Sequence, residues 1–511
     1  MMGGDGTLSG PGSSNDDRTS AKDGMHERRG RGTKLTASRE RAVAAIAAAH
    51  ESAAVPALTD SEPVLGLIDL DHVAEAFAEL RAAFDTDTEV LHAVACKAVP
   101  LLPLLRYYAE SGAGCEVASP GELESALTAG FAPNRIVFDS PAKTESELRR
   151  ALSLGVSINV DSWEELERLD RLVDAGTESV IGIRINPQSG IGEIGAMSTA
   201  TSTSKFGIGL ADPGARQAIV DAYRARPWLT QIHVHSGSQG IGLDQAAEGI
   251  AAVVDLAREI NAGTADARAA DAGESVGEGD RHGDTDPRQV TRIDIGGGLP
   301  VNFFGDEVTP TFADYRAVIE ARVPELFDFD IVTEFGRSLL AKAGSILTRV
   351  EYAKTTGGRR IAITHAGVQV ATRTAYAPAD WTVRILPFAP DGTPKPTSVG
   401  HAEGPELVHT DVAGPACFAG DLLAEDRLLP RLDAGDLIVV PDTGAYYFSN
   451  PFSYNLLPRV PVYGYRTSSE TDASGLGSDN LGERVDFFLI RRGQTIAEIL
   501  AEAGEPKIEP L

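Results

Sequence analysis

A lysine closes one of the apolar, strand-like stretches of this chain. Lys97 follows residues 91–96 (LHAVAC) and precedes Ala98. An amine in a partly desolvated site has a lowered pKa, and its free base attacks carbonyl carbons. We therefore predict a lowered pKa and a nucleophilic role for Lys97. A strand-end lysine that points into solvent is the alternative, and the residues downstream argue against it.

Other polar residues, and several glycines, also follow strand-like stretches. Glu116 and Ser119 come after the next stretch, and the later ones lead into Ser238, Gly296, Gly297, Gly298, Glu334, Gly336 and Arg337. Consecutive glycines let backbone N–H groups approach an anion, and a following helix N-terminus adds a favourable dipole. The glycine run with Ser238 therefore predicts a phosphate site, against the alternative of a plain turn. Glu334 suits a protonated pyridine nitrogen, or else a salt bridge with Arg337 at the rim of a barrel.

Two histidines stand on one face of a strand. His233 and His235 are two residues apart, so their side chains point the same way. A metal site is the alternative that we do not favour, because no third ligand of matching spacing is visible. We predict that His235 stacks on a flat aromatic ring.

Strand and helix patterns alternate along the first two thirds of the chain, with short connections. Repeated units that close after about eight predict a (β/α)₈ TIM barrel, in which catalytic residues gather at the carboxyl ends of the strands. An open doubly wound sheet is the alternative, but no dinucleotide fingerprint supports it. After the barrel, short alternating strands predict a separate β domain, a β-sandwich or barrel.

The expected organisation has four parts. Residues 1–36 form a disordered tail, 37–67 an N-terminal segment that joins the β domain, 68–337 the barrel and 338–511 the β domain. A disordered insertion is expected at 263–289 because that stretch is polar and rich in Gly, Ala and Asp. Its role stays open, and a lid is one option.

Composition excludes several classes of partner. The net charge is −28, from 74 acidic and 46 basic residues, which argues against a nucleic-acid partner. No apolar run is long enough to span a bilayer, and the N-terminus lacks the apolar core of a signal peptide. The three cysteines, Cys96, Cys115 and Cys417, form neither a disulfide framework nor a metal motif, which predicts a reducing cytoplasm.

Taken together, the motifs resemble the fold-type III pyridoxal-phosphate (PLP) decarboxylases, the group that acts on diaminopimelate, ornithine and arginine. The resemblance covers residues 63–500, and within the group it is strongest to diaminopimelate decarboxylase. It is carried by HAVACK (92–97), CEVASPGE (115–122), RINP (184–187), SKFG (204–207), HVHSGSQ (233–239), IGGGLP (295–300), EFGR (334–337), GPAC (414–417) and DTGAY (442–446).

The resemblance implies roles for single residues. Lys97 forms a Schiff base with the cofactor, His235 stacks on its ring and Glu334 pairs with the pyridine nitrogen. Other cofactor contacts are expected from Glu116, Ser238, Gly296, Gly297, Gly298, Gly336, Arg337 and Tyr446. Cys417 is expected to reach into the neighbouring subunit of a homodimer and to protonate the carbanion left by an amino-acid substrate. A small buried core cysteine is the alternative for Cys417.

One position departs from the family pattern. In the family, the residue after the cysteine is acidic and binds the distal ammonium of the substrate. This chain has Phe418 at that position. Burying an unpaired charge is expensive, so we predict a substrate without a distal ammonium, with an apolar or carboxylate-bearing end. Arg373, Tyr376, Arg337 and Tyr446 complete the expected substrate contacts. A racemase or epimerase, or a non-catalytic PLP-binding regulator, remain the alternative functions.

Overall fold

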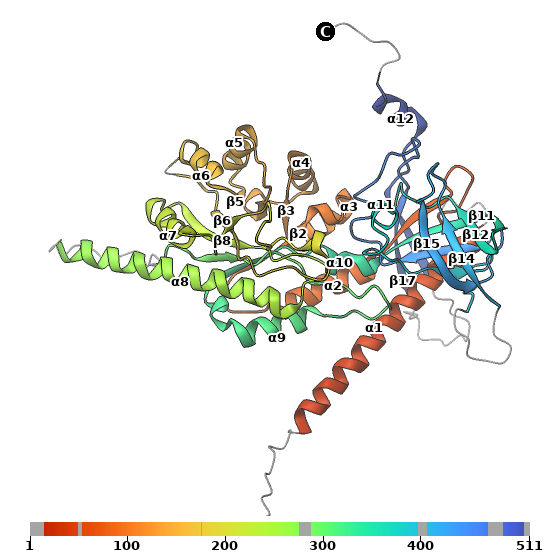
Figure 1. Cartoon of the computed structure of the whole chain (residues 1–511), viewed down its shortest axis with the longest axis horizontal. Coiled ribbons are helices and arrows are strands. Elements are labelled where there is room, and N and C mark those ends of the chain that lie inside the picture. Colours follow the sequence, from red (N-terminus) through yellow and green to blue (C-terminus); the bar gives the residue numbers. More distant parts are fainter. Residues whose placement is uncertain are drawn as a thin grey trace, which may run out of the picture.

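A computed structural model describes residues 15–49, 54–174, 176–274, 288–396, 406–468 and 484–504. A barrel wrapped by helices and a β-rich body lie next to each other (Figure 1). No helix within the described ranges is long and apolar enough to cross a membrane.

Eight parallel strands form a closed barrel, which confirms the predicted fold. β2 pairs with both β3 and β10, and β5 with both β4 and β6, so the sheet has no free edge around the ring. The apolar runs are buried on both faces, as a barrel covered by helices requires. The strands are β2 (Val90–Ala95), β3 (Gly114–Val117), β4 (Ile136–Phe138), β5 (Ser157–Val160), β6 (Ile181–Asn186), β8 (Leu229–Val234), β9 (Arg292–Asp294) and β10 (Asp330–Thr333); the short β7 (Ile208–Gly209) pairs with β6 outside the ring.

Helices cover the outside of the barrel (Figure 1). Their starts follow local chemistry: Thr144 and Glu147 form a capping box at α5, and Ser119 caps α4 by accepting a bond from Glu122 N. Ser119 is therefore a capping residue. The helices are α2 (Leu70–Ala83), α3 (Leu102–Glu110), α4 (Pro120–Ala129), α5 (Glu145–Leu154), α6 (Trp163–Asp170), α7 (Ala215–Ala225), α8 (Leu243–Glu274) and α9 (Phe312–Arg322).

Part of the expected disordered insertion is helical. α8 continues to Glu274 and so covers residues 263–274, which a disordered segment was predicted to occupy. The stretch is rich in alanine, the best helix former, and this propensity favours the continuation of α8. Residues 275–287 lie outside the described ranges. Gln289 is anchored, since its Nε2 donates to the carbonyl of Tyr223.

The β domain also takes in the first strand of the chain. β1 (Val64–Asp69) pairs antiparallel with β11 and parallel with β17, both strands of the β domain. The remaining strands are β11 (Gly344–Thr356), β12 (Arg359–Thr364), β13 (Leu386–Phe388), β14 (Leu407–Ala413), β15 (Leu422–Pro430), β16 (Leu437–Pro441), β17 (Val462–Ser468) and β18 (Arg484–Arg491), with the short helices α10 (Arg337–Leu340), α11 (Thr372–Tyr376) and α12 (Ile496–Glu502).

A long N-terminal helix, α1 (Asn15–Ala48), replaces much of the expected tail. Its Ala42, Val43 and Ile46 pack in one apolar cluster with strand residues of the β domain. Arg31 and Lys34 pair with Glu79 and Glu75 of α2. Ion pairs to a distant helix hold residues 31–34, and such pairs leave no periodic apolar signal in the sequence.

A buried ion network joins α1, a barrel loop and the β domain. Asp306 accepts from Arg39 at 2.6 Å and from Arg384 at 2.5 Å, and Arg384 also bonds Asp442 at 2.8 Å. Lys342 lies 3.2 Å from Asp442. The network fixes the β domain against the end of the barrel where the strands finish.

Candidate active site

A cavity of about 390 Å³ opens at the carboxyl ends of the barrel strands. Lys97 follows β2, His235 follows β8, Gly298 follows β9 and Glu334 follows β10, so the strand-end rule brings four separate predictions together. The lining also includes Asp139, Arg184, Lys205, Phe206, Ser238, Gly336, Arg337, Arg373 and Tyr446.

Lys97 is ion-paired at the floor of the cavity. Its Nζ lies 2.6 Å from Glu116, whose side chain is fully buried, while 45% of the Lys97 side chain is exposed toward the cavity. Burial lowers the pKa of Lys97, but Glu116, with Tyr446 and Glu334, outweighs burial and raises it above its usual range. The predicted lowered pKa is therefore wrong, because the sequence did not reveal a carboxylate in contact with the amine.

His235 presents a neutral ring to the cavity. The N–H of Gly297 donates to His235 Nδ1 at 3.1 Å, which places the ring proton on Nε2. Burial, with Arg184 and Lys97 nearby, lowers the pKa of His235 well below its usual value. A neutral ring held by a backbone N–H suits stacking on a flat ligand.

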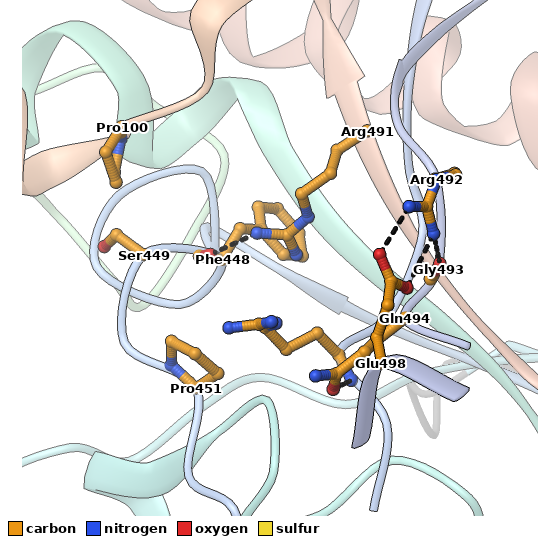
Figure 2. A pocket seen from close by; sticks show the side chains of 10 residues that line it. Pro100, Phe448, Ser449, Pro451, Arg491, Arg492, Gly493, Gln494 and Glu498 are labelled. Atoms are coloured by element: carbon orange, nitrogen blue, oxygen red, sulfur yellow. Dashed lines mark hydrogen bonds and ion pairs between the residues drawn. The ribbon is translucent and has the colours of Figure 1, made fainter. Parts of the chain in front are cut away.

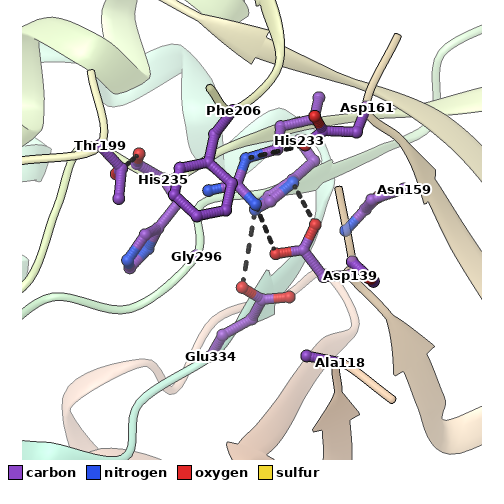
Figure 3. Close-up of polar contacts among 12 residues, drawn as sticks. Ala118, Asp139, Asn159, Asp161, Thr199, Phe206, His233, His235, Gly296 and Glu334 are labelled. Atoms are coloured by element: carbon purple, nitrogen blue, oxygen red, sulfur yellow. Dashed lines mark hydrogen bonds and ion pairs between the residues drawn. The ribbon is translucent and has the colours of Figure 1, made fainter. Parts of the chain in front are cut away.

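A second polar cluster borders the cavity, and Figure 3 shows its contacts. His233 stands between two carboxyls, with Nδ1 3.5 Å from Asp139 and Nε2 3.6 Å from Glu334. Arg184 bonds Asp139 at 2.9 Å, and it lowers the pKa of Asp139 below its usual range although burial opposes this. Burial, with Asp139 and Glu116, raises the pKa of Glu334 well above normal.

The same cluster bears on the metal alternative. One ligand atom from each of Asp139, His233 and Glu334 lies within 4.8 Å of the others, a set that spacing along the chain did not show. Arg184 already neutralises Asp139, so a metal ion here would compete with a fixed guanidinium. The cluster suits an organic cation near Glu334 better, because Glu334 Oε1 is buried without a hydrogen-bond partner among the described residues.

The opposite side of the cavity is suited to an anion. Arg337 donates to Ser238 Oγ at 3.2 Å, and Tyr446 lies with its ring 4.7 Å from the Arg337 guanidinium. A Cβ on Gly298 would stand 2.1 Å from the carbonyl of Gly237, so only glycine permits this close backbone approach. The expected helix directly after the glycine run is absent, since α9 starts only at Phe312. A helix dipole therefore does not contribute to anion binding at Gly296–Gly298.

Six predicted residues do not line this cavity: Glu116, Gly296 and Gly297 of the barrel, and three residues of the β domain. Cys417, Phe418 and Tyr376 are on the β domain and do not line the pocket of their own chain. Cys417 is exposed, with its N–H bonded to Asn455, so it is not the small core residue of the alternative. Phe418 stacks on Tyr376 with ring centroids 5.7 Å apart.

Several lining residues were missed as functional. Arg184 and Lys205 stand in two of the motifs that carry the resemblance, but neither was given a role. Asp139 directly follows β4 (Ile136–Phe138), so the strand-end rule alone predicts it. Phe206 lies over the Arg184 guanidinium at 4.5 Å.

Comparison with known proteins gives the site a context. The model of the family described as "Pyridoxal-dependent decarboxylase, pyridoxal binding domain" matches residues 70–283. A diaminopimelate decarboxylase of Pseudomonas aeruginosa is 33% identical over 390 residues, 75% of this chain and 83% of that protein. One from Vibrio cholerae is 33% identical over 368 residues, 72% and 79%. The crystal structure of Helicobacter pylori diaminopimelate decarboxylase complexed with L-lysine is 26% identical, with a TM-score of 0.65, covering 86% of this chain and 97% of that one.

The barrel, the lysine at its rim and the matched family model define a pyridoxal-phosphate-dependent enzyme. The chain belongs to the ornithine, arginine and diaminopimelate decarboxylase family, and it is a PLP-dependent carboxy-lyase. The cavity fits that cofactor. The partnerless Glu334 Oε1 suits a ring N–H, and the Gly298 and Ser238 side suits a phosphate.

Proposed function

We propose that this enzyme decarboxylates an α-amino acid whose distal end carries a carboxylate and no ammonium. The observation that carries the proposal is a pair of arginines, Arg337 and Arg373, in the cavity. Neither guanidinium has a carboxylate within 4 Å in the part of the chain that the structure describes. Arg373 Nη1 is buried without a hydrogen-bond partner there.

Aromatic rings replace counter-ions around these arginines. Both guanidiniums lie over Tyr446 and Trp381, at 4.7–5.0 Å from the ring centroids. Burial lowers the pKa of Arg337 to about 10, and it also lowers the pKa of Arg373. A substrate carboxylate would supply the missing negative charge and a bidentate hydrogen-bond acceptor.

Phe418 supports the absence of a distal ammonium. It belongs to an aromatic cluster with Tyr376, Phe452 and Tyr454, whose neighbouring ring centroids lie 5.4–6.0 Å apart. Such rings offer no carboxylate to a buried cation. The relatives named above are diaminopimelate decarboxylases, and meso-diaminopimelate is therefore the substrate to test against.

The proposed roles divide the chemistry among this chain's residues. Lys97 would hold the cofactor covalently, Glu334 would accept the ring N–H, and Ser238 with Gly298 would border the phosphate. Pyridoxal phosphate, when bound, would supply the sink for the electron pair that stays on the α-carbon when the carboxylate leaves as CO₂. The partner subunit's Cys417 then returns a proton to the α-carbon in a homodimer with shared sites.

The deciding experiment compares two substrates that differ only at the distal nitrogen. Released CO₂ is measured with L-2-aminopimelate and with meso-diaminopimelate, and deuterium uptake at the α-carbon is followed in parallel. We expect kcat/KM for 2-aminopimelate to be at least about tenfold higher, because the ammonium lacks a partner. Preferred turnover of meso-diaminopimelate would refute the substrate proposal, and deuterium uptake without CO₂ would indicate a racemase.

Two variants make this experiment sharper. Phe418→Glu introduces the acidic residue that the family carries after the cysteine. This variant is expected to shift substrate preference toward meso-diaminopimelate. Phe418→Leu removes the ring without adding charge and serves as the matched control. Equal shifts in both variants would mean that ring loss, and not charge, sets the preference.

A further inference from the structure

A second cavity lies apart from the catalytic one, between the loop after β2 and the end of the β domain. Its volume is about 430 Å³. It combines apolar walls with a group of arginines, and Figure 2 shows these side chains around the opening. The lining is Pro100, Phe448, Ser449, Pro451, Arg459, Arg491, Arg492, Gly493, Gln494 and Glu498.

Positive charge in this second cavity exceeds the negative charge that faces it. Arg492 pairs with Glu498, and Arg459 bonds Glu502 at 2.7 Å. Arg491 has only main-chain partners among the described residues, the carbonyls of Phe448 at 2.9 Å and Val460 at 3.0 Å. A surplus cation is notable in a chain with net charge −28.

The charge of Arg491 is also destabilised by its surroundings. Burial and the neighbouring Arg459 both lower the pKa of Arg491, and its Nε is buried without a hydrogen-bond partner in the described part. An anion between the two guanidiniums would relieve their repulsion and offer the missing acceptor. Phe448, Pro100 and Pro451 would contact an apolar body attached to that anion.

One segment borders both cavities. Tyr446 lines the catalytic cavity, while Phe448, Ser449 and Pro451 line the second one. The N–H of Tyr446 donates to Ala98 O at 2.9 Å, and Ser449 Oγ donates to the same atom at 3.3 Å. Ala98 follows Lys97, so a ligand that moves residues 446–451 acts on both the cofactor lysine and Tyr446.

We propose that the second cavity binds a small organic anion, a carboxylate or a phosphate ester with an apolar body, and that its occupancy alters catalysis through residues 446–451. The site is independent of the amino acid that the enzyme decarboxylates. Because ligand and substrate occupy different cavities, the effect of one on the other is a coupling between sites.

The test uses PLP-loaded enzyme whose cofactor has been fixed by borohydride, so that a phosphate probe cannot enter the catalytic site. Phenyl phosphate, benzoate and inorganic phosphate are titrated by calorimetry. We expect saturable binding of phenyl phosphate or benzoate at about millimolar Kd or tighter, and weaker binding of inorganic phosphate, which lacks the apolar body. Absence of saturable binding by all three probes would overturn the proposal.

Variants locate the binding and test its consequence. Arg459→Gln should raise Kd about tenfold, since it removes one charge-assisted contact with the anion. Arg492→Gln should also raise Kd, because it leaves the carboxylate of Glu498 unpaired beside the anion. Arg491 is left unchanged because it holds two main-chain carbonyls. Arg216→Gln is the matched control, an exposed arginine paired with Glu259 on the barrel. Unchanged Kd in both pocket variants would place the ligand elsewhere and refute the site.

Coupling is read separately on active, unreduced enzyme. We expect the tightest-binding probe to shift KM for the amino-acid substrate severalfold in the wild type and in Arg216→Gln. The same probe should leave the KM of Arg459→Gln unchanged. Binding that leaves KM and kcat unchanged would overturn the coupling. An effect that persists in Arg459→Gln would point to direct competition at the catalytic cavity.

Discussion

Three buried carboxyls surround the floor of the catalytic cavity, and each meets a different kind of partner. Glu116 contacts Lys97 at 2.6 Å and Asp139 contacts Arg184 at 2.9 Å. Glu334 faces only His233 at 3.6 Å and keeps one oxygen without a partner among the described residues. Glu334 is thus the carboxyl that most needs an added cation, as a protonated ring nitrogen would provide.

The first prediction concerns the stability cost of Glu334 in cofactor-free protein. Its folded-state pKa is raised, so the folded state binds the proton more tightly, and stability falls as pH rises above the unfolded value of about 4.3. Glu334→Gln cannot ionise and should raise the melting temperature at pH 8 more than at pH 5. Differential scanning calorimetry of the cofactor-free proteins at both pH values checks this.

The same variant should lose activity while it gains stability. With the cofactor bound, we expect kcat to fall at least about a hundredfold, because a neutral amide does not hold the ring nitrogen protonated. A Glu334→Gln protein that is less stable than the wild type at pH 8 would contradict a raised folded-state pKa of Glu334.

At the scale of elements, the loop after β9 comes close to the loop after β8. The second prediction is that Gly298→Ala weakens PLP binding at least about tenfold, because its Cβ would stand 2.1 Å from Gly237 O. Gly112→Ala is a matched control. Both glycines have positive φ, +104° and +81°, but Gly112 has open space around it. The absorbance of the bound cofactor gives Kd, and equal losses in both variants would assign the effect to backbone strain alone.

The third prediction concerns the junction of α1, the barrel and the β domain. Asp306→Asn should lower the free energy of unfolding by about 3 kcal/mol, because Arg39 and Arg384 would lose their shared, largely buried carboxylate. Urea unfolding measures the change, with the exposed neighbour Glu307→Gln as control.

That junction also has a defined pH dependence. Arg39 and Arg384 lower the pKa of Asp306 below its usual range, against the opposing effect of burial. The contribution of Asp306 is therefore complete above the unfolded pKa of about 3.9 and is lost as pH falls below it. An Asp306→Asn protein that is as stable as the wild type at pH 7 would show that the network is dispensable.

At the scale of the whole molecule, the two groups that we propose as catalytic lie in different parts of one chain. Lys97 is in the barrel cavity, whereas Cys417 is exposed on the β domain and absent from the lining of that cavity. We therefore expect each complete site to combine the barrel of one subunit with the β domain of another.

The fourth prediction tests this division. Lys97→Ala and Cys417→Ala homodimers should each be nearly inactive, and mixing them under conditions that exchange subunits should restore up to about a quarter of wild-type activity. Random exchange makes half of the dimers mixed, with one intact site in each. CO₂ release before and after exchange measures the effect. Lack of recovery, despite verified exchange, would place Lys97 and Cys417 in the same subunit's site.

The features that the sequence predicted are those that short segments of the chain determine. Apolar runs broken by turns placed the barrel strands, and the residues at their ends, Lys97, His235 and Glu334, converge because all parallel strands of a barrel finish on one side. The contact of Glu116 with Lys97, and the meeting of Asp139, His233 and Glu334, join residues far apart in the chain. No periodicity encodes those distances.

The sequence by itself determined the barrel, the family and the cavity residues Lys97, His235 and Glu334, because strand periodicity and motif composition are properties of short segments. Only the tertiary structure decided the raised pKa of Lys97 and the pairing of Arg31 and Lys34 with carboxylates of α2. Each of these depends on a partner from a distant segment, and electrostatic and packing energies depend on the distance to that partner in space.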